Sequence, residues 1–221
     1  MALFIPWGLF SLSYFFFALI FRVGTNDVLY TGEKIGFARR FTEFLSELFA
    51  LEDVTVTLEN RAAGGKSLDY AWVMANSINE NADIVLVENV VISAYKYGAY
   101  EKFLRYLLQL PRRPAVILVD WTKMSTYESF VSTDPAWTPA ELLSQYYRVP
   151  ILRMPRVLMS GHSACVTEAA APYVAHTMPT QNGMHHLFNL SGAMLYNDYI
   201  HPNVIGHQLI ACLLGEMVYA A

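Results

Sequence analysis

Short apolar runs alternate along this chain with segments whose apolar residues recur at helical spacing. Ile84–Glu88 and Ala115–Asp120 have the length of buried strands, and Val54–Leu58 alternates as a strand does. Helical spacing covers residues 33–51, 68–79, 95–110, 139–147 and 204–219. Strands separated by helices need crossover connections, so the sequence predicts an α/β fold: a three-layer α/β/α sandwich with a mainly parallel central sheet. In such sheets the site lies at the carboxyl ends of the strands.

The composition fits one folded domain. The chain has 221 residues, 54% of them hydrophobic, which is enough for one substantial core and too little for two. The formal net charge is −4, and Lys and Arg form no long run, which argues against a nucleic-acid partner. We therefore predict a domain over residues 24–221, preceded by an apolar segment over residues 1–23.

The amino-terminal segment allows two interpretations. Residues 1–21 carry no charged side chain, and their number is about that needed for a helix to cross a bilayer. Such a signal anchor would place the protein at a membrane or in the secretory pathway, whereas without it a soluble protein is expected. Residues 15–23 also have the pattern of a fully buried parallel strand that runs into a glycine turn. The same residues cannot serve as both, so the two interpretations stay open.

The cysteines and three of the histidines indicate no metal site. Cys165 and Cys212 match neither a disulfide framework nor a zinc spacing, and both stand among apolar residues, so we expect buried free thiols. His176, His185 and His186 have no carboxylate or cysteine at ligand spacing. We therefore expect neither a metal nor another cofactor.

A polar element stands directly before the last helical segment. Asp198 and His201 are three residues apart and are followed by Pro202. A turn of this kind can aim both side chains into one cleft, where the carboxylate orients the imidazole and the ring accepts a proton from a nucleophile. The alternative is a helix-capping Asp beside a surface His. The D-x-x-H-P pattern resembles the last conserved block of the SGNH (GDSL-type) hydrolases. That resemblance implies an SGNH-hydrolase-like, flavodoxin-like fold with His201 as catalytic base and Asp198 as its orienting acid.

A second block of that family has the form Asn-x-x-x-x-Gly-x-Ser/Thr, and Asn60, Gly65 and Ser67 match it. The resemblance implies that the backbone amide of Gly65 donates to the oxyanion of the reacting ester. Glycine suits this role because it has no Cβ to obstruct the approach of the substrate. Taken alone, a Gly-Gly turn before a helix is usually only a turn.

The two other blocks of the family are degenerate here. The nucleophilic Ser of the family falls at Asn26 if Gly24 is the first glycine of its block, and Thr25 takes that place only after a register shift. Ile92 stands where the third block carries an oxyanion-binding Asn, and Asn89 lies three residues too early. A triad without its serine loses several orders of magnitude of rate. A catalytically inactive member is therefore an alternative to an active one.

A different nucleophile is also conceivable from the sequence. Gly161-His162-Ser163 follows an apolar run and resembles the nucleophile elbow of α/β hydrolases, although Cys165 replaces its second glycine. The structural alternative for Ser163 is a helix cap. Three hypotheses result: an SGNH-type esterase for a small carboxylic ester or an acylated glycan, an inactive SGNH-fold binding protein, and an α/β hydrolase built around Ser163.

Overall fold

The computed structural model describes residues 17–24, 36–50, 54–62, 78–88, 97–120, 139–154, 165, 202 and 204–219. Its strands are β1 (Phe17–Gly24), β2 (Thr55–Asn60), β3 (Ile84–Glu88), β4 (Ala115–Asp120) and β5 (Ile151–Arg153). They form one sheet in the order β2-β1-β3-β4-β5, and every neighbouring pair is parallel. This is the strand order of flavodoxin-like doubly wound folds. The predicted parallel sheet is therefore confirmed.

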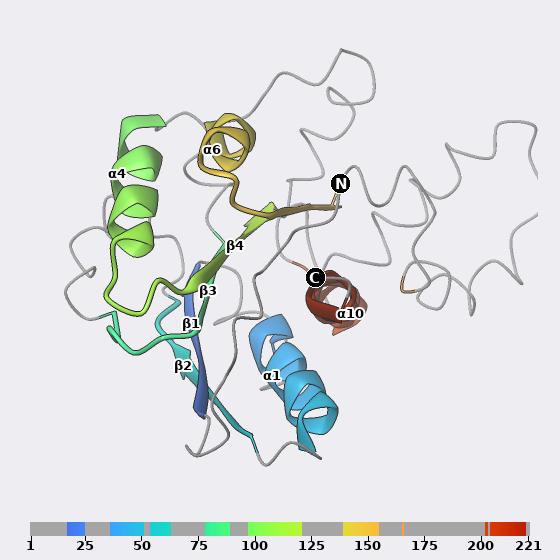
Figure 1. Cartoon of the computed structure of the whole chain (residues 1–221). Helices are drawn as coiled ribbons and strands as arrows, with labels where there is room; N and C mark the ends of the chain where they lie inside the picture. Colours follow the sequence, from blue (N-terminus) through green and yellow to red (C-terminus); the bar gives the residue numbers. More distant parts are fainter. Residues whose placement is uncertain are drawn as a thin grey trace, which may run out of the picture.

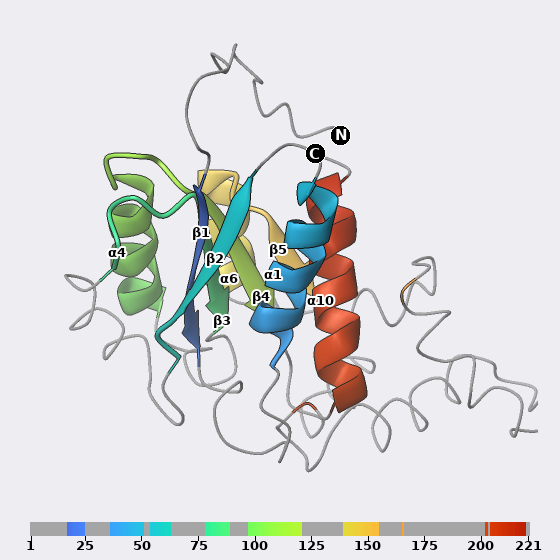
Figure 2. The ribbon, with the colours of Figure 1, turned by 90° about the horizontal axis from the view of Figure 1, so that it is seen from below.

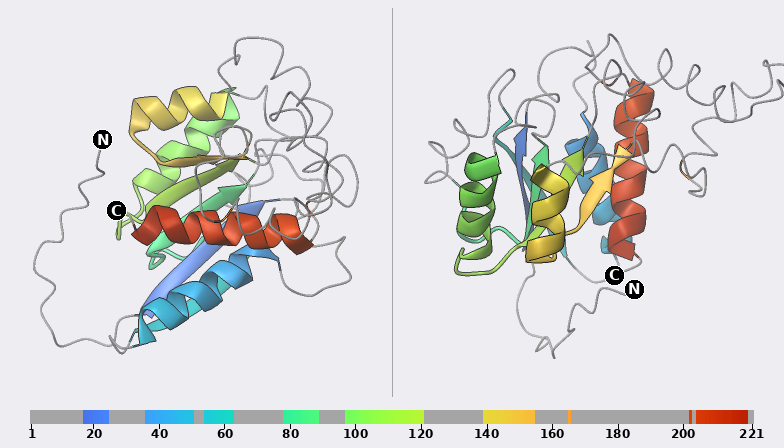
Figure 3. Two further views of the ribbon diagram at one scale, coloured as in Figure 1. Left: turned by 90° about the vertical axis from the view of Figure 1, so that its right-hand side faces the viewer. Right: turned by 90° about the horizontal axis from the view of Figure 1, so that it is seen from above.

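Helices cover both faces of the sheet. The helices α1 (Phe37–Leu48) and α10 (Val204–Tyr219) lie on one face, and α4 (Tyr97–Leu108) and α6 (Pro139–Tyr147) lie on the other (Figure 1). The two views of Figure 3 show the same three layers from the side and from above. This arrangement confirms the α/β/α sandwich.

Two hydrophobic cores result from the alternation of side chains along the strands. Leu86, Ile117 and Val119 point toward α1 and α10, whereas Val87 and Leu118 point toward α4 and α6. Neighbouring residues of a strand face opposite sides, so a strand covered on both faces is apolar at almost every position. This explains why the short apolar runs of the sequence are strands.

Helix α1 shows how one helix is built to pack on the sheet. Phe37, Phe41 and Leu45 recur at four-residue intervals and are all 0% exposed, while Arg39 and Glu43 on the outer face form an exposed ion pair. Four-residue spacing places side chains on one face of a helix, one turn above the other. The helix predicted over residues 33–51 is thus present as α1, with shorter ends among the described residues.

The apolar amino-terminal segment contributes a strand. Residues 17–24 form β1, which pairs with β2 on one side and β3 on the other. For these residues the strand interpretation therefore applies, while residues 1–16 lie outside the described residues. Among the helices that the structure describes, none has the length and apolar character required to span a bilayer.

The prediction of free thiols was wrong. Cys165 and Cys212 form a disulfide, with their Cα atoms 5.8 Å apart. Cys165 is buried in the core beside α10, and Cys212 is part of α10 itself. The two cysteines are 47 residues apart in the sequence, and only the packing of the helix onto the sheet brings them together.

Candidate functional site

The carboxyl ends of β1, β2 and β3 meet at one edge of the sheet. In the register of the strands, Arg22 of β1 pairs with Asn60 of β2, and Gly24 of β1 pairs with Glu88 of β3. The strand order reverses at β1, because the next strand in the sequence lies on one side of it and the third lies on the other. Such a switch point at the carboxyl edge is where open α/β sheets bind their ligands.

The amino-terminal ends of α1 and α10 lie together at this same edge. The crossover from β1 leads into α1, so α1 begins at the carboxyl end of the sheet. The backbone N–H of Phe37, the first residue of α1, donates to Nδ1 of His207 in α10 at 3.3 Å. Figure 2 shows the two helices side by side and running in the same direction. Helix amino termini carry a partial positive charge, which favours negative charge nearby.

Asn60 turns the chain at the end of β2. Its Oδ1 accepts a hydrogen bond from the backbone N–H of Ala62 at 3.0 Å. This is the local side-chain bond by which Asn commonly starts a turn. The segment that carries Gly65 therefore leaves the sheet at its carboxyl edge.

The site residues predicted from the sequence all lie outside the described residues. They are Thr25, Asn26, Gly65, Ser163, Asp198 and His201. Two of them are bonded to residues that the structure describes. Consecutive Cα atoms are about 3.8 Å apart, which ties Thr25 to Gly24 at the end of β1 and His201 to Pro202 just before α10.

A buried ionic network, which sequence reasoning missed, lies at the carboxyl ends of β4 and β5. Nε of Arg153 is 3.4 Å from Oδ2 of Asp120, and the guanidinium also bonds the carboxylate of Glu141 in α6. The three residues are 5%, 2% and 3% exposed. Buried charges persist only when they are paired. The signal available in the sequence was the charged residue that ends each of these otherwise apolar strands.

Tyr100 of α4 lies beside this network and is 1% exposed. Burial raises the pKa of its phenol well above the usual value, and the charges of Asp120 and Glu88 raise it further. Glu88, at the end of β3, is itself 1% exposed. The phenol therefore stays protonated at physiological pH. The network joins β4, β5 and α6 at the carboxyl edge of the sheet.

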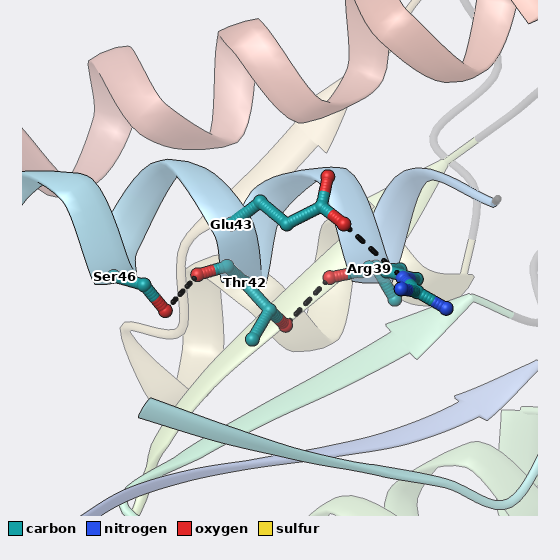
Figure 4. Close-up of polar contacts among 5 residues, drawn as sticks. Arg39, Thr42, Glu43 and Ser46 are labelled. Carbon is teal, nitrogen blue, oxygen red and sulfur yellow. Dashed lines mark hydrogen bonds and ion pairs between the residues drawn. The ribbon is translucent and has the colours of Figure 1, made fainter. Parts of the chain in front are cut away.

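A shallow groove of about 550 Å³ lies along the flank between α1 and β2. Figure 4 shows that its hydroxyl groups are turned back onto their own helix. The hydroxyl of Thr42 donates to the carbonyl of Ala38, and that of Ser46 donates to the carbonyl of Thr42, each at 2.8 Å. Arg39 is paired with Glu43 at 3.1 Å. The donor hydrogens of both hydroxyl groups are thus used within α1, and within the described part of the chain no cluster of metal-binding side chains occurs.

This chain is similar to known proteins in its structure but not detectably in its sequence. No protein-family model matches the sequence, and neither does any curated protein sequence. The fold is similar to that of a two-domain esterase active on acetylated mannans, with a TM-score of 0.66, 16% identity and 92% of this chain covered. The chain spans 49% of that esterase.

Two similar structures match over nearly their full length. One is a GDSL-like lipase from Parabacteroides merdae, with a TM-score of 0.58 and 15% identity, covering 95% of this chain and 99% of the lipase. The other is an acetylxylan esterase from Geobacillus stearothermophilus, with a TM-score of 0.54 and 13% identity, covering 90% of this chain and 93% of the esterase. The chain therefore has the α/β fold of these esterases and of the GDSL-like lipase, which is the fold that the SGNH resemblance predicts.

Proposed function

We propose that this chain is an SGNH-type ester hydrolase that removes acyl groups from a small carboxylic ester or from a glycan. His201 is the general base, Asp198 orients its imidazole, and the Gly65 amide stabilises the oxyanion. Acylated glycans are favoured as substrates because the similar structures include an esterase active on acetylated mannans and an acetylxylan esterase.

The observation that carries this proposal is the gathering of three attachment points at one edge of the sheet. The ends of β1 and β2 are neighbours in register there, and the Phe37–His207 hydrogen bond holds the start of α10 against the start of α1. The segments with Thr25, Gly65 and His201 are attached at these three points. The closeness of these three points supports a single site formed by the three segments.

In the proposed reaction, a nucleophilic oxygen attacks the acyl carbon and passes its proton to His201. The carbonyl oxygen becomes an oxyanion, which accepts a hydrogen bond from the Gly65 amide. The bond between the acyl carbon and the alcohol oxygen then breaks, and the alcohol leaves with the proton from His201. Water hydrolyses the acyl enzyme by the same steps. The hydroxyl of Thr25, next to the end of β1, is our candidate for the nucleophile.

A catalytically inactive binding protein is the second candidate function. It is favoured by the sequence between β1 and α1, where residues 25–36 contain no serine. An α/β hydrolase around Ser163 has less support. Cys165 stands where a nucleophile elbow has its second glycine, and Ser163 lies outside the described residues.

Hydrolysis of p-nitrophenyl acetate and of acetylated xylan tests the proposal. We expect turnover by the wild-type protein and a loss of about 10³-fold or more in kcat for His201→Asn and Asp198→Asn, since each removes part of the acid–base unit. His176→Asn is the matched control and should keep the wild-type rate. A fluorophosphonate probe, mapped by mass spectrometry, should label Thr25.

The remaining outcomes separate the three hypotheses. Labelling that disappears in Ser163→Ala would favour the α/β-hydrolase mechanism. A folded protein that neither labels nor turns over any acetyl ester would favour the inactive binding protein. Equal rates for His201→Asn and His176→Asn would refute the assigned base.

A further inference from the structure

The hydrogen bond between α1 and α10 joins residues that are far apart in the sequence. Phe37 and His207 are 170 positions apart, and both are buried, at 0% and 1% exposure. Their rings are also stacked, with centroids 6.0 Å apart and planes inclined by 21°. The contact therefore combines a directional hydrogen bond with a ring stack, and both partners are buried.

At the amino terminus of α1, the acceptor for the Phe37 N–H comes from another helix. The first N–H groups of a helix have no acceptor within the helix, and a polar residue at the N-cap usually supplies one. Here the N-cap is Gly36, which has no side chain to serve as an acceptor, and the first turn of α1 has no acidic residue. The imidazole of His207 supplies an acceptor from a different helix.

The bond also fixes the chemical form of the imidazole. Nδ1 accepts a hydrogen bond from the Phe37 amide, so Nδ1 carries no hydrogen of its own and a neutral ring carries its hydrogen on Nε2. Lys, Arg or Leu at this position would have no acceptor to offer. Asn would have one, because its Oδ1 lies about as far along the side chain as Nδ1 of His.

We propose that His207 is a positioning residue for ester hydrolysis. Its hydrogen bond to Phe37 holds the start of α10 against the start of α1 and thereby fixes the relative position of the two proposed catalytic segments. His201 stands six residues before His207, and the segment with Thr25 and Asn26 leads into α1. The inference rests on the proposed function, because it assigns a kinetic effect to a residue that touches neither substrate nor nucleophile.

A small displacement of these segments has a large kinetic consequence. A misplacement of about 1 Å, arising far from the chemistry, can reduce the rate by about 10²-fold. Substrate binding depends on other contacts, so KM should change much less than kcat. This separation distinguishes positioning from a general loss of folded protein.

The test compares His207→Leu with His207→Asn in the full chain. We expect His207→Leu to lower kcat by about 10- to 10²-fold with KM within about twofold, and to accelerate hydrogen exchange at the Phe37 amide by about tenfold or more. His207→Asn should restore most of the kcat and of the protection. Circular dichroism establishes that each variant is folded.

Gly215→Ala is the matched control at the far end of the same helix pair. An added Cβ there would lie 2.7 Å from Cε1 of Phe44, so the α1–α10 contact is disturbed eight residues beyond His207. The Phe44 ring must shift to admit the added methyl group, and the control should leave kcat unchanged. If Gly215→Ala reduces kcat as much as His207→Leu does, the role of His207 is merely structural and the proposal fails.

Two failures can be told apart. Wild-type protein that is folded, with a protected Phe37 amide, but inactive would overturn the hydrolase proposal and the kinetic role of His207 with it. An active wild type with unchanged kcat in folded His207→Leu would overturn the positioning role alone. Loss of kcat without rescue by Asn would also contradict the hydrogen-bond mechanism.

Discussion

The Cys165–Cys212 disulfide should make a large contribution to stability. It closes a loop of 47 residues, for which the chain-entropy model gives a loss of about 14 cal/mol/K in the unfolded state, or about 4 kcal/mol at 25 °C. In a chain of this size, 1 kcal/mol corresponds to about 2–4 °C in Tm, so removal of the disulfide should lower Tm by about 8–16 °C. The double variant Cys165→Ala/Cys212→Ala removes it without leaving thiols.

Urea denaturation followed by circular dichroism measures this contribution. The wild-type protein is unfolded with and without reductant, and the double variant is unfolded under the same two conditions. Reductant should destabilise the wild type by about 4 kcal/mol and leave the double variant unchanged, because only the wild type has a bond to reduce. Thiol titration in denaturant should find no free thiol before reduction and two after it.

Two results would refute this reasoning. Two reactive thiols in the unreduced, denatured protein would show that the disulfide is not formed. A double variant within about 1 kcal/mol of the oxidised wild type would show that the loop constrains the unfolded chain far less than the entropy model requires.

Other perturbations should have distinct signatures. Because burial and nearby carboxylates raise the pKa of Tyr100, its contribution to stability is complete below about pH 10 and is lost as the pH rises further, by about 1.4 kcal/mol per unit. Urea denaturation between pH 9 and 11 should show a shallower decline in Tyr100→Phe, and equal slopes would contradict this. Arg153→Met leaves buried carboxylates without their cation and should cost about 3–5 kcal/mol in the same assay, against less than about 1 kcal/mol for the exposed Arg39→Met. Asn26→Ser places a serine next to the proposed nucleophile Thr25 and should leave fluorophosphonate labelling at the wild-type level, whereas stronger labelling would favour the alignment with Asn26 at the nucleophile position.

The fold could be predicted because its signals are local. The strands β3 and β4 coincide with the apolar runs 84–88 and 115–120, and α6 and α10 coincide with the predicted helices over 139–147 and 204–219. A parallel sheet covered on both faces makes its strands uniformly apolar. The same property made the amino-terminal segment ambiguous, since a central strand and a membrane anchor share an apolar composition.

The contacts that join distant parts of the chain could not be predicted. The disulfide links positions 47 apart, and the Phe37–His207 hydrogen bond links positions 170 apart. Both depend on where α10 packs in the fold, and neither has a periodic signal. Arg153 likewise meets Glu141 only because α6 leads directly into β5. The predicted catalytic residues stay predictions, since they lie beyond the described elements.

The most direct test of the central claim is a crystal structure of the protein with a bound phosphonate that mimics the tetrahedral intermediate. The account predicts one phosphonate oxygen within about 3.1 Å of the Gly65 amide and the imidazole of His201 within about 3.2 Å of the bound group. A His201 side chain that points into solvent, away from the turn at Gly65, would contradict it.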